Sequence, residues 1–208
     1  MPTITALAPQ KHRPGRIRVE IDFQYAFELS RKVVQNKCVC EGEELDPARR
    51  RELESIAARE AAIGLLARRE RSRAELAGAL KRKGFDESVI NAVLDVLEKE
   101  KLQSDDRFAS SWVSTRRRVA PRGRTALAYE LKQRGIDDAT INKTLREFSA
   151  SDERDALREL IEARLRRLSH AKDDRPREKQ RLLAFLARRG FAYEDIRSVL
   201  SAHFPDWA

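Results

Sequence analysis

The chain contains three copies of one pattern, and this internal repeat limits its possible folds more than any other feature. Aligning the sequence on Gly84, Gly135 and Gly190, which lie 51 and 55 residues apart, brings matching residues together. In each copy, leucines stand eight and four residues before the glycine, a basic residue directly precedes it and a large apolar residue directly follows it. Isoleucine stands six residues after the glycine and leucine ten residues after it. A repeat of this length predicts a tandem array of small helical units.

The spacing around each glycine predicts two helices joined by a turn. Apolar residues four positions apart lie on one face of a helix, and glycine suits the left-handed backbone conformation that ends a helix. Asp86 and Asp137 follow the glycine closely and are good N-caps for the next helix, whereas the third copy has Ala192 there. Ser72 and Glu75 form a capping box that starts the helix before the first of these glycines.

Each copy also has an apolar stripe upstream, which predicts a third helix. The stripe residues are, in chain order, Ala58, Ala61, Ala62, Leu65 and Leu66; Phe108, Trp112 and Val113; and Leu157, Leu160, Ile161, Leu165 and Leu168. Composition supports helices throughout, because aromatic residues make up only 6% of the chain and strong helix formers dominate. Three short helices enclose only a small core, so we expect neighbouring units to lean on one another.

The part of the chain before the repeats has a different pattern. Residues 1–15 contain three prolines and no sustained period, which predicts a flexible arm. From Arg16 to Phe23, apolar and charged residues alternate as in a strand with one buried face. A small β-hairpin is therefore a candidate, although the segment lacks the usual Asn-Gly or Asp-Gly turn. Ser30 can cap a short helix that runs through Val34.

Together these patterns predict an all-α fold of three tandem three-helix, helix-turn-helix-like repeats in an elongated, curved array. A short N-terminal segment with a candidate β-hairpin precedes the repeats. We expect residues 1–54 to form the N-terminal arm with the hairpin and a short helix. The repeats should then occupy residues 55–103, 104–149 and 150–208.

Charge is distributed unevenly within each repeat. The net charge of +9 and the pI near 9.9 suit a polyanionic partner such as nucleic acid, although a basic protein can also be no more than soluble. The third helices are acidic, because segment 86–100 sums to −4 and segments 137–148 and 192–203 each sum to −1. These helices are unsuited to the major groove, where the second helix of a helix-turn-helix pair would lie against phosphates.

Positive charge gathers instead on the first and second helices and on the connections between them. Segment 107–134 sums to +7. The candidate binding residues are Arg68, Arg69, Arg71, Arg73, Lys81, Arg82 and Lys83 in the first repeat, and Arg116, Arg117, Arg118, Arg122, Arg124 and Arg134 in the second. A basic stripe that recurs with each unit suits an extended polyanion or a filament with repeated acidic sites. Arginines on solvated helix faces without any function are the alternative.

Residues that could carry chemistry are scarce. His12, His170 and His203 are scattered without zinc-binding spacing, and the chain has no nucleotide-binding glycine motif and no nucleophile motif. Cys38 and Cys40 form a lone C-x-C pair, which we interpret as reduced structural thiols. The sequence therefore predicts a protein that is not an enzyme, with no cofactor and no metal. It has neither a signal peptide nor an apolar span, so we expect it in the cytoplasm and away from membranes.

Several local motifs occur in a fixed order along the repeats. They are LLARRERSRAEL at residues 65–76, KGF at 83–85, DDRFA at 105–109, EL at 130–131, RGI at 134–136 and RRGF at 188–191. Together they resemble the RecX regulatory protein family over residues 16–203, and the GEEL segment at residues 42–45 is similar to the leader of that family. Two departures are a glycine-poor loop at residues 119–123 and a longer insert at residues 169–177.

The resemblance implies a regulator of the recombinase RecA. Members of this family lodge in the groove of the RecA filament on single-stranded DNA and inhibit its ATPase, recombinase and SOS co-protease activities. The implied partners are therefore the RecA filament and single-stranded DNA, with double-stranded DNA as a further candidate. We expect a monomer, although the sequence leaves the oligomeric state open. The alternative from the residues alone is a DNA-binding architectural or transcriptional protein built from helix-turn-helix units.

Overall fold

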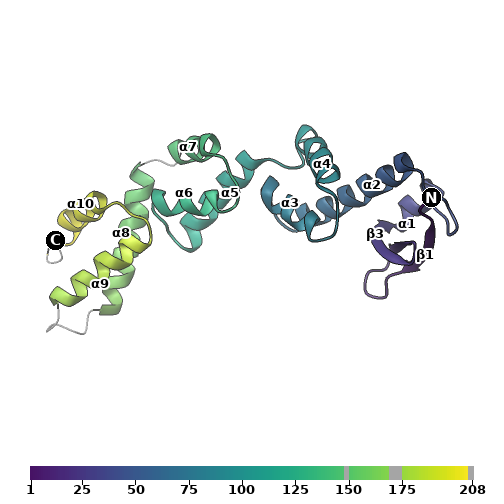
Figure 1. Cartoon of the computed structure of the whole chain (residues 1–208). Coiled ribbons are helices and arrows are strands. Elements are labelled where there is room, and N and C mark those ends of the chain that lie inside the picture. The colour runs from purple at the N-terminus through teal and green to yellow at the C-terminus, as the bar shows by residue number, and fades with distance from the viewer. Residues whose placement is uncertain (148–149, 169–174, 206–208) are drawn as a thin grey trace. The chain divides into compact units, whose positions relative to one another are not determined.

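The computed structural model describes residues 1–147, 150–168 and 175–205 (Figure 1). His170 and most of the insert predicted at residues 169–177 lie outside this described part. The chain divides into two compact units, Met1–Ser104 and Asp105–Ala208. Within the described ranges, no helix is both long enough and apolar enough to cross a membrane.

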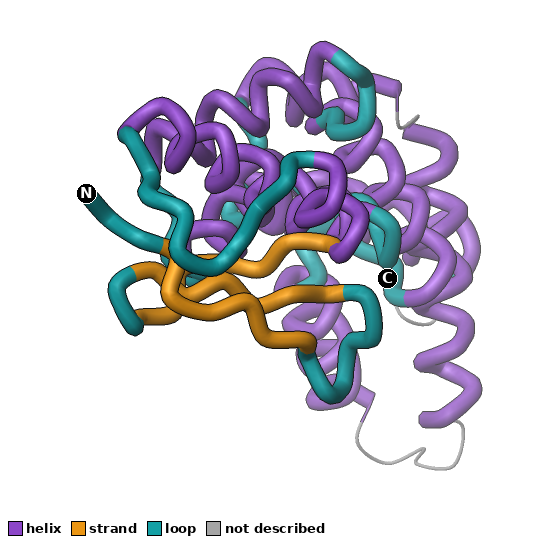
Figure 2. Tube along the Cα trace, turned by 90° about the vertical axis from the view of Figure 1, so that its right-hand side faces the viewer, coloured by secondary structure: helices purple, strands orange, loops and turns teal. Residues whose placement is uncertain are grey.

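The first unit begins with a three-stranded antiparallel sheet in the order β1-β2-β3 (Figure 2). Its strands are β1 (Ile4–Pro9), β2 (Arg16–Ile21) and β3 (Gln24–Ser30). The hairpin predicted from alternation is confirmed as β2 and β3. Its turn has two non-glycine residues at positive φ, Asp22 at 50° and Phe23 at 63°, which is how the chain reverses without the usual Asn-Gly pair.

The flexible arm predicted for residues 1–15 is wrong, because β1 pairs along β2. Ile4 is fully buried and lies opposite Ile21 in the ladder. The prolines that suggested disorder do not prevent pairing, since Pro9 is the last residue of an edge strand, where a missing N–H is tolerated. Burial of Ile4 in the sheet core therefore outweighs the local signal for a loop.

Two helices follow the sheet. Ser30 caps α1 (Arg31–Asn36) as predicted, by accepting a hydrogen bond from the Val33 backbone N–H. The long helix α2 (Pro47–Leu66) is capped by Asp46 and begins with proline, a favoured first residue. The N-terminal part of α2 packs Leu53 and Ala57 against the sheet, whereas Ala58 and Ala62 belong to the core of the first repeat. The boundary expected between residues 54 and 55 falls inside this helix.

Three three-helix repeats follow in order, as predicted. The first uses α2 with α3 (Arg73–Lys81) and α4 (Glu87–Lys99), the second α5 (Asp105–Val119), α6 (Arg124–Lys132) and α7 (Asp138–Glu147), and the third α8 (Ala150–Leu168), α9 (Arg175–Arg188) and α10 (Tyr193–His203). Each repeat encloses its own small apolar core. The predicted stripe residues Phe108, Leu157 and Ile161 are buried in these cores.

The repeated glycines end the second helix of each repeat as the spacing predicts. Gly84, Gly135 and Gly190 have φ values of 89°, 76° and 82°. Each glycine N–H donates to the carbonyl three residues earlier, and the next residue's N–H donates to the carbonyl five residues earlier. This is the Schellman arrangement. It turns the following apolar residue inward, and Phe85 packs against both the sheet core and the core of the first repeat.

Candidate functional site

Six of the thirteen basic residues predicted to bind a partner form ion pairs within their own unit. The pairs are Arg69 with Glu75 at 2.9 Å, Arg73 with Asp95 at 2.7 Å and Glu98 at 3.4 Å, Arg116 with Glu130 at 2.7 Å, Arg117 with Asp152 at 2.7 Å, Arg122 with Glu130 at 3.3 Å and Arg124 with Glu153 at 2.8 Å. Acidic residues of the chain itself therefore neutralise much of the positive charge that was counted in the sequence.

Glu130 organises the basic residues between α5 and α6. Its Oε2 atom accepts hydrogen bonds from Trp112 Nε1 at 2.9 Å and from Arg116 Nε at 2.7 Å. The guanidinium of Arg116 lies 4.4 Å from the Trp112 ring centroid, and that of Arg134 lies 3.7 Å from it. Cation–π contacts and charge-assisted hydrogen bonds at these distances hold two helices together. We therefore assign Arg116 and Arg134 a structural role in the second repeat.

The start of α6 is held by an acid from the third repeat. Gly123 occupies the cap position and offers no side chain. Buried Glu153 on α8 takes its place, because its carboxylate accepts from both the backbone N–H and the Nε of Arg124, at 2.9 and 2.8 Å. Arg117 pairs with Asp152 on the same helix. The second and third repeats therefore lean on each other as expected, and two of the central arginines hold them together.

Arg118 is the member of the central cluster without an ion pair in the described parts of the chain. It is exposed, and it lines a hollow of about 380 Å³ together with Asp155 and Glu159. Acids that line the same hollow reduce the attraction of this position for a polyanion. The five arginines that are so prominent in the sequence therefore do not form an open basic surface.

Basic residues without an ion pair are found in the first unit, and we call them open. Arg68, Lys81, Arg82 and Lys83 form no ion pair within residues 1–104, all of which are described. Arg68 lies in the α2–α3 connection, Lys81 is the last residue of α3, and Arg82 and Lys83 follow it. Burial lowers the pKa of nearby Arg71, and the positive charges of neighbouring arginines lower it further. Like charges are thus crowded here, so an anion bound at this place would relieve repulsion.

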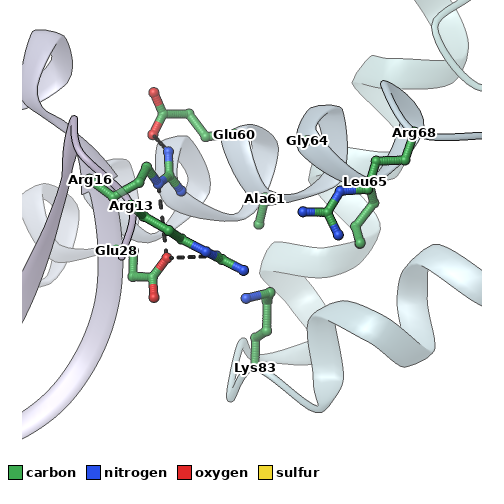
Figure 3. A pocket seen from close by; sticks show the side chains of 9 residues that line it. All are labelled: Arg13, Arg16, Glu28, Glu60, Ala61, Gly64, Leu65, Arg68 and Lys83. Carbon is green, nitrogen blue, oxygen red and sulfur yellow. Dashed lines mark hydrogen bonds and ion pairs between the residues drawn. The ribbon is translucent and has the colours of Figure 1, made fainter. Parts of the chain in front are cut away.

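Two further basic residues join this surface that the sequence reasoning did not select. Arg13 and Arg16, at the loop between β1 and β2, line a cavity with Arg68 and Lys83 (Figure 3). Arg13 was missed because residues 1–15 were expected to be a flexible arm. Arg16 was placed only on the solvent face of a strand. The available signal was that Arg13 and Arg16 flank a Pro-Gly turn and so fall at one end of the sheet.

Three of the five acids in segment 86–100 pair with the first repeat's own arginines. Arg73 on α3 bonds Asp95 and Glu98, and Arg59 on α2 bonds Glu100 at 2.7 Å. These contacts use the negative charge of the third helix to hold the repeat together. They agree with the sequence argument that this helix is unsuited to contact DNA phosphates.

Family models for the RecX first, second and third three-helix domains match residues 58–97, 104–145 and 152–200. The regulatory protein RecX of Mycobacterium sp. (strain KMS) is 43% identical over 134 residues, 62% of this chain and 72% of the relative. That of Mycobacterium tuberculosis (strain CDC 1551 / Oshkosh) is 43% identical over 136 residues, 64% of this chain and 78% of the relative.

Two solved structures share the fold. A crystal structure of regulatory protein RecX has a TM-score of 0.61 at 21% identity and covers 97% of this chain and 100% of its own. RecX from Lactobacillus salivarius has a TM-score of 0.64 at 22% identity and covers 72% of this chain and 96% of its own. Since the three domain models match in order and together span more than half of the sequence, the chain belongs to the RecX family of regulatory proteins.

Proposed function

We propose that this chain is a negative regulator of the recombinase RecA that acts in DNA repair. It binds RecA filaments on single-stranded DNA and inhibits ATP hydrolysis, recombination and the co-protease activity behind the SOS response. The observation that carries the proposal is the ordered match of all three RecX domains. Relatives named regulatory protein RecX at 43% identity support a regulatory role.

The distribution of open charge supports binding to a filament coated with negative charge. Lys81 and Arg82 are exposed and carry no ion pair within the first unit. A filament repeats the same acidic or phosphate sites along its length, so several weak contacts from one chain add up to tight binding. In this mechanism the open basic residues of the first unit attract the filament, while the paired arginines of the second unit keep its repeats rigid.

The alternative, an architectural or transcriptional protein with helix-turn-helix units, is less consistent with the charges. Using α4 as a recognition helix would bring Asp95 and Glu98 toward phosphates and would compete with their ion pairs to Arg73. Both effects oppose binding in the major groove. The charges of α4 therefore argue against a DNA-binding protein that uses this helix for recognition.

A RecA assay tests the proposal. The full chain is added to RecA on single-stranded DNA, and ATP hydrolysis is followed as the ratio of chain to RecA rises. We expect dose-dependent inhibition. A variant with Lys81→Glu and Arg82→Glu should inhibit at least about tenfold less well, because charge reversal opposes association with a polyanion. The matched control reverses Lys99 and Arg146, which are also exposed, and should inhibit like the wild type.

Two results would count against the proposal. If the wild-type chain at amounts equal to RecA leaves hydrolysis unchanged, regulation of RecA is excluded. If the control variant loses inhibition as strongly as the Lys81 and Arg82 variant, total charge is responsible and the first unit has no special part. Circular dichroism of each variant checks that its helices are intact.

A further inference from the structure

A solvent-open cavity of about 370 Å³ lies between the sheet and the first repeat, wholly within the first unit (Figure 3). One wall comes from the sheet and its β1–β2 loop, with Arg13 and Arg16. The other wall comes from the first repeat, with Arg68 after α2 and Lys83 after α3. Figure 3 shows the end groups of Arg13, Arg68 and Lys83 directed toward the same space from three different segments.

The two acids of the cavity, Glu28 on β3 and Glu60 on α2, already have partners on the sheet side. Glu60 Oε2 accepts from Arg16 Nη1 at 2.6 Å and from the Ser30 backbone N–H at 2.8 Å. Glu28 accepts from Gln10 Nε2 at 2.7 Å and lies 3.6 Å from Arg13 Nη1. These contacts fix the wall and neutralise Arg16.

The cations of the opposite wall are not paired with either acid of the cavity. Neither Arg68 nor Lys83 forms an ion pair with any residue of the first unit, and Arg13 meets Glu28 only at 3.6 Å with 54% of its side chain exposed. Three cationic groups therefore share one space with little compensation. Because like charges repel, the site is lowest in free energy when an anion lies between them.

The floor of the cavity is made of small residues that leave room for a ligand. Ala61 and Gly64 stand on the α2 face that forms the floor. A Cβ added at Gly64 would have no atom within 4 Å, so the space above it is empty of protein. Guanidinium and ammonium groups around an open floor suit a phosphate, which accepts several hydrogen bonds at once.

Two more exposed cations lie at the β1–β2 loop, which supplies Arg13 to the cavity. Lys11 belongs to the same β1–β2 loop, and Arg31 begins α1, where its backbone N–H bonds Gly15 of that loop at 2.8 Å. Neither side chain has an ion pair within the first unit. Exposed cations beside a solvent-open cavity suit a polymer that carries several phosphates better than an isolated carboxylate.

We propose that this cavity binds a phosphate group of a single-stranded DNA backbone. Arg13, Arg68 and Lys83 donate to the phosphate oxygens, and Arg16, held by Glu60, is a positioning residue that keeps the sheet wall in place. The sheet and the first repeat therefore form one site together, which neither makes alone. This inference rests on the proposed function, because it identifies where a chain bound to the filament would contact the DNA.

Direct DNA binding without RecA tests the inference. The full chain is titrated against a fluorescently labelled oligothymidylate, and anisotropy is followed over a range of NaCl concentrations. The test variant combines Arg13→Ala, Arg68→Ala and Lys83→Ala. The control combines Arg51→Ala, Lys99→Ala and Arg146→Ala, which removes the same charge from exposed positions elsewhere. We expect the test variant to bind about tenfold more weakly or worse, and the control to change by less than about twofold.

The salt dependence gives a second readout. Each phosphate contact on single-stranded DNA contributes about 0.7 to the slope of log K against log salt. Loss of one or two phosphates from the cavity should therefore reduce the slope by about 0.7 to 1.4, and the control should keep the wild-type slope. Equal loss in the test and control variants, or wild-type binding by the test variant, would overturn the inference.

A third variant blocks the cavity without changing charge. Gly64→Gln places a long polar side chain over the floor, and glutamine favours a helix more than glycine does, so α2 should remain folded. We expect weaker DNA binding with unchanged circular dichroism. Unchanged binding by this variant would count against phosphate entering the cavity.

The same proteins in the RecA assay separate this inference from the proposed function. If the wild-type chain inhibits RecA but does not bind oligothymidylate, the phosphate site is excluded and the proposed function stands. If the chain binds oligothymidylate through the cavity but does not inhibit RecA, the proposed function is excluded and the phosphate site stands.

Discussion

Replacing Gly123 with serine should destabilise the second unit, although serine is the better helix cap. Gly123 has φ −75° and ψ 165°, a conformation open to any residue. Its backbone N–H donates to the Arg189 carbonyl at 3.0 Å. An added Cβ would overlap the carbonyl group of Gly190 and lie 2.5 Å from the Phe191 backbone nitrogen. The two backbones approach so closely that no side chain fits between them.

The size of the effect follows from opposing terms. Two terms stabilise the variant. A serine cap raises the free energy of unfolding by a few tenths of a kcal/mol relative to glycine, and the reduced freedom of the unfolded chain raises it by about 0.4 to 1 kcal/mol more. Forcing an extra atom into a packed site costs about 1 to 3 kcal/mol, and loss of the hydrogen bond to Arg189 costs about 1 kcal/mol more. The net expectation is a loss of about 1 to 3 kcal/mol.

Tryptophan fluorescence during urea unfolding measures this change, because Trp112 lies in α5 of the second repeat. A Trp207→Phe background makes Trp112 the only tryptophan of the chain. The control is Gly64→Ser in the first unit, where an added Cβ meets no neighbour within 4 Å. It should leave the Trp112 transition unchanged. A Gly123→Ser variant as stable as the wild type, or more stable, would refute the close backbone contact.

Two further predictions concern single carboxylates of the second repeat. Glu130→Gln should lower the stability reported by tryptophan fluorescence by about 1 to 2 kcal/mol, because Arg116 loses its charged partner; an equal effect of the exposed Glu159→Gln would contradict this. Asp137 caps α7 by accepting from the Thr140 N–H at 2.9 Å, and this backbone hydrogen bond lowers the pKa of its carboxyl. Because this pKa is lower in the folded than in the unfolded state, the cap stabilises the fold fully at pH values above the ordinary aspartate pKa of about 3.9. This stabilisation is lost as the pH falls through the pKa of the folded state. Asp137→Ala should therefore be less stable than wild type at neutral pH, and the difference in stability should narrow in thermal melts as the pH falls below the ordinary pKa of an aspartate; a difference independent of pH would exclude the charged cap.

The helical repeats could be predicted from the sequence because their signals are local. Gly135, for example, ends α6 through hydrogen bonds that span only a few residues, and the leucines that pack beneath it follow the helical period. The first strand could not be predicted in the same way. Ile4 is buried because its strand pairs with Ile21. The sequence of residues 1–15 contains no pattern that predicts this non-local pairing.

For the candidate site, too, local features could be predicted from the sequence and non-local contacts could not. Counting charges separated the acidic segment 86–100 from the basic segment 107–134, but it could not tell an arginine in an ion pair from one without a partner. Arg124 contacts Glu153, which lies 29 positions later in the sequence, because α6 packs on α8. Lys83 stays open because no acid of the first unit reaches it. Only the packed structure determines which cations remain available to a partner.

The shared helix α2 makes the sheet part of the repeat array. Leu53 and Ala57 enter the sheet core, and the next turn supplies Ala58 and Ala62 to the first repeat. Arrays of repeats need an end unit that covers the apolar side of the first repeat. Here the three strands form that end cap. Deleting them would expose the apolar side chains of Leu53 and Ala57 to water, and the exposed apolar surface would favour aggregation. The N-terminal strands thus cover apolar residues of the helix that begins the first repeat, which is the place that a terminal capping repeat takes in other solenoids.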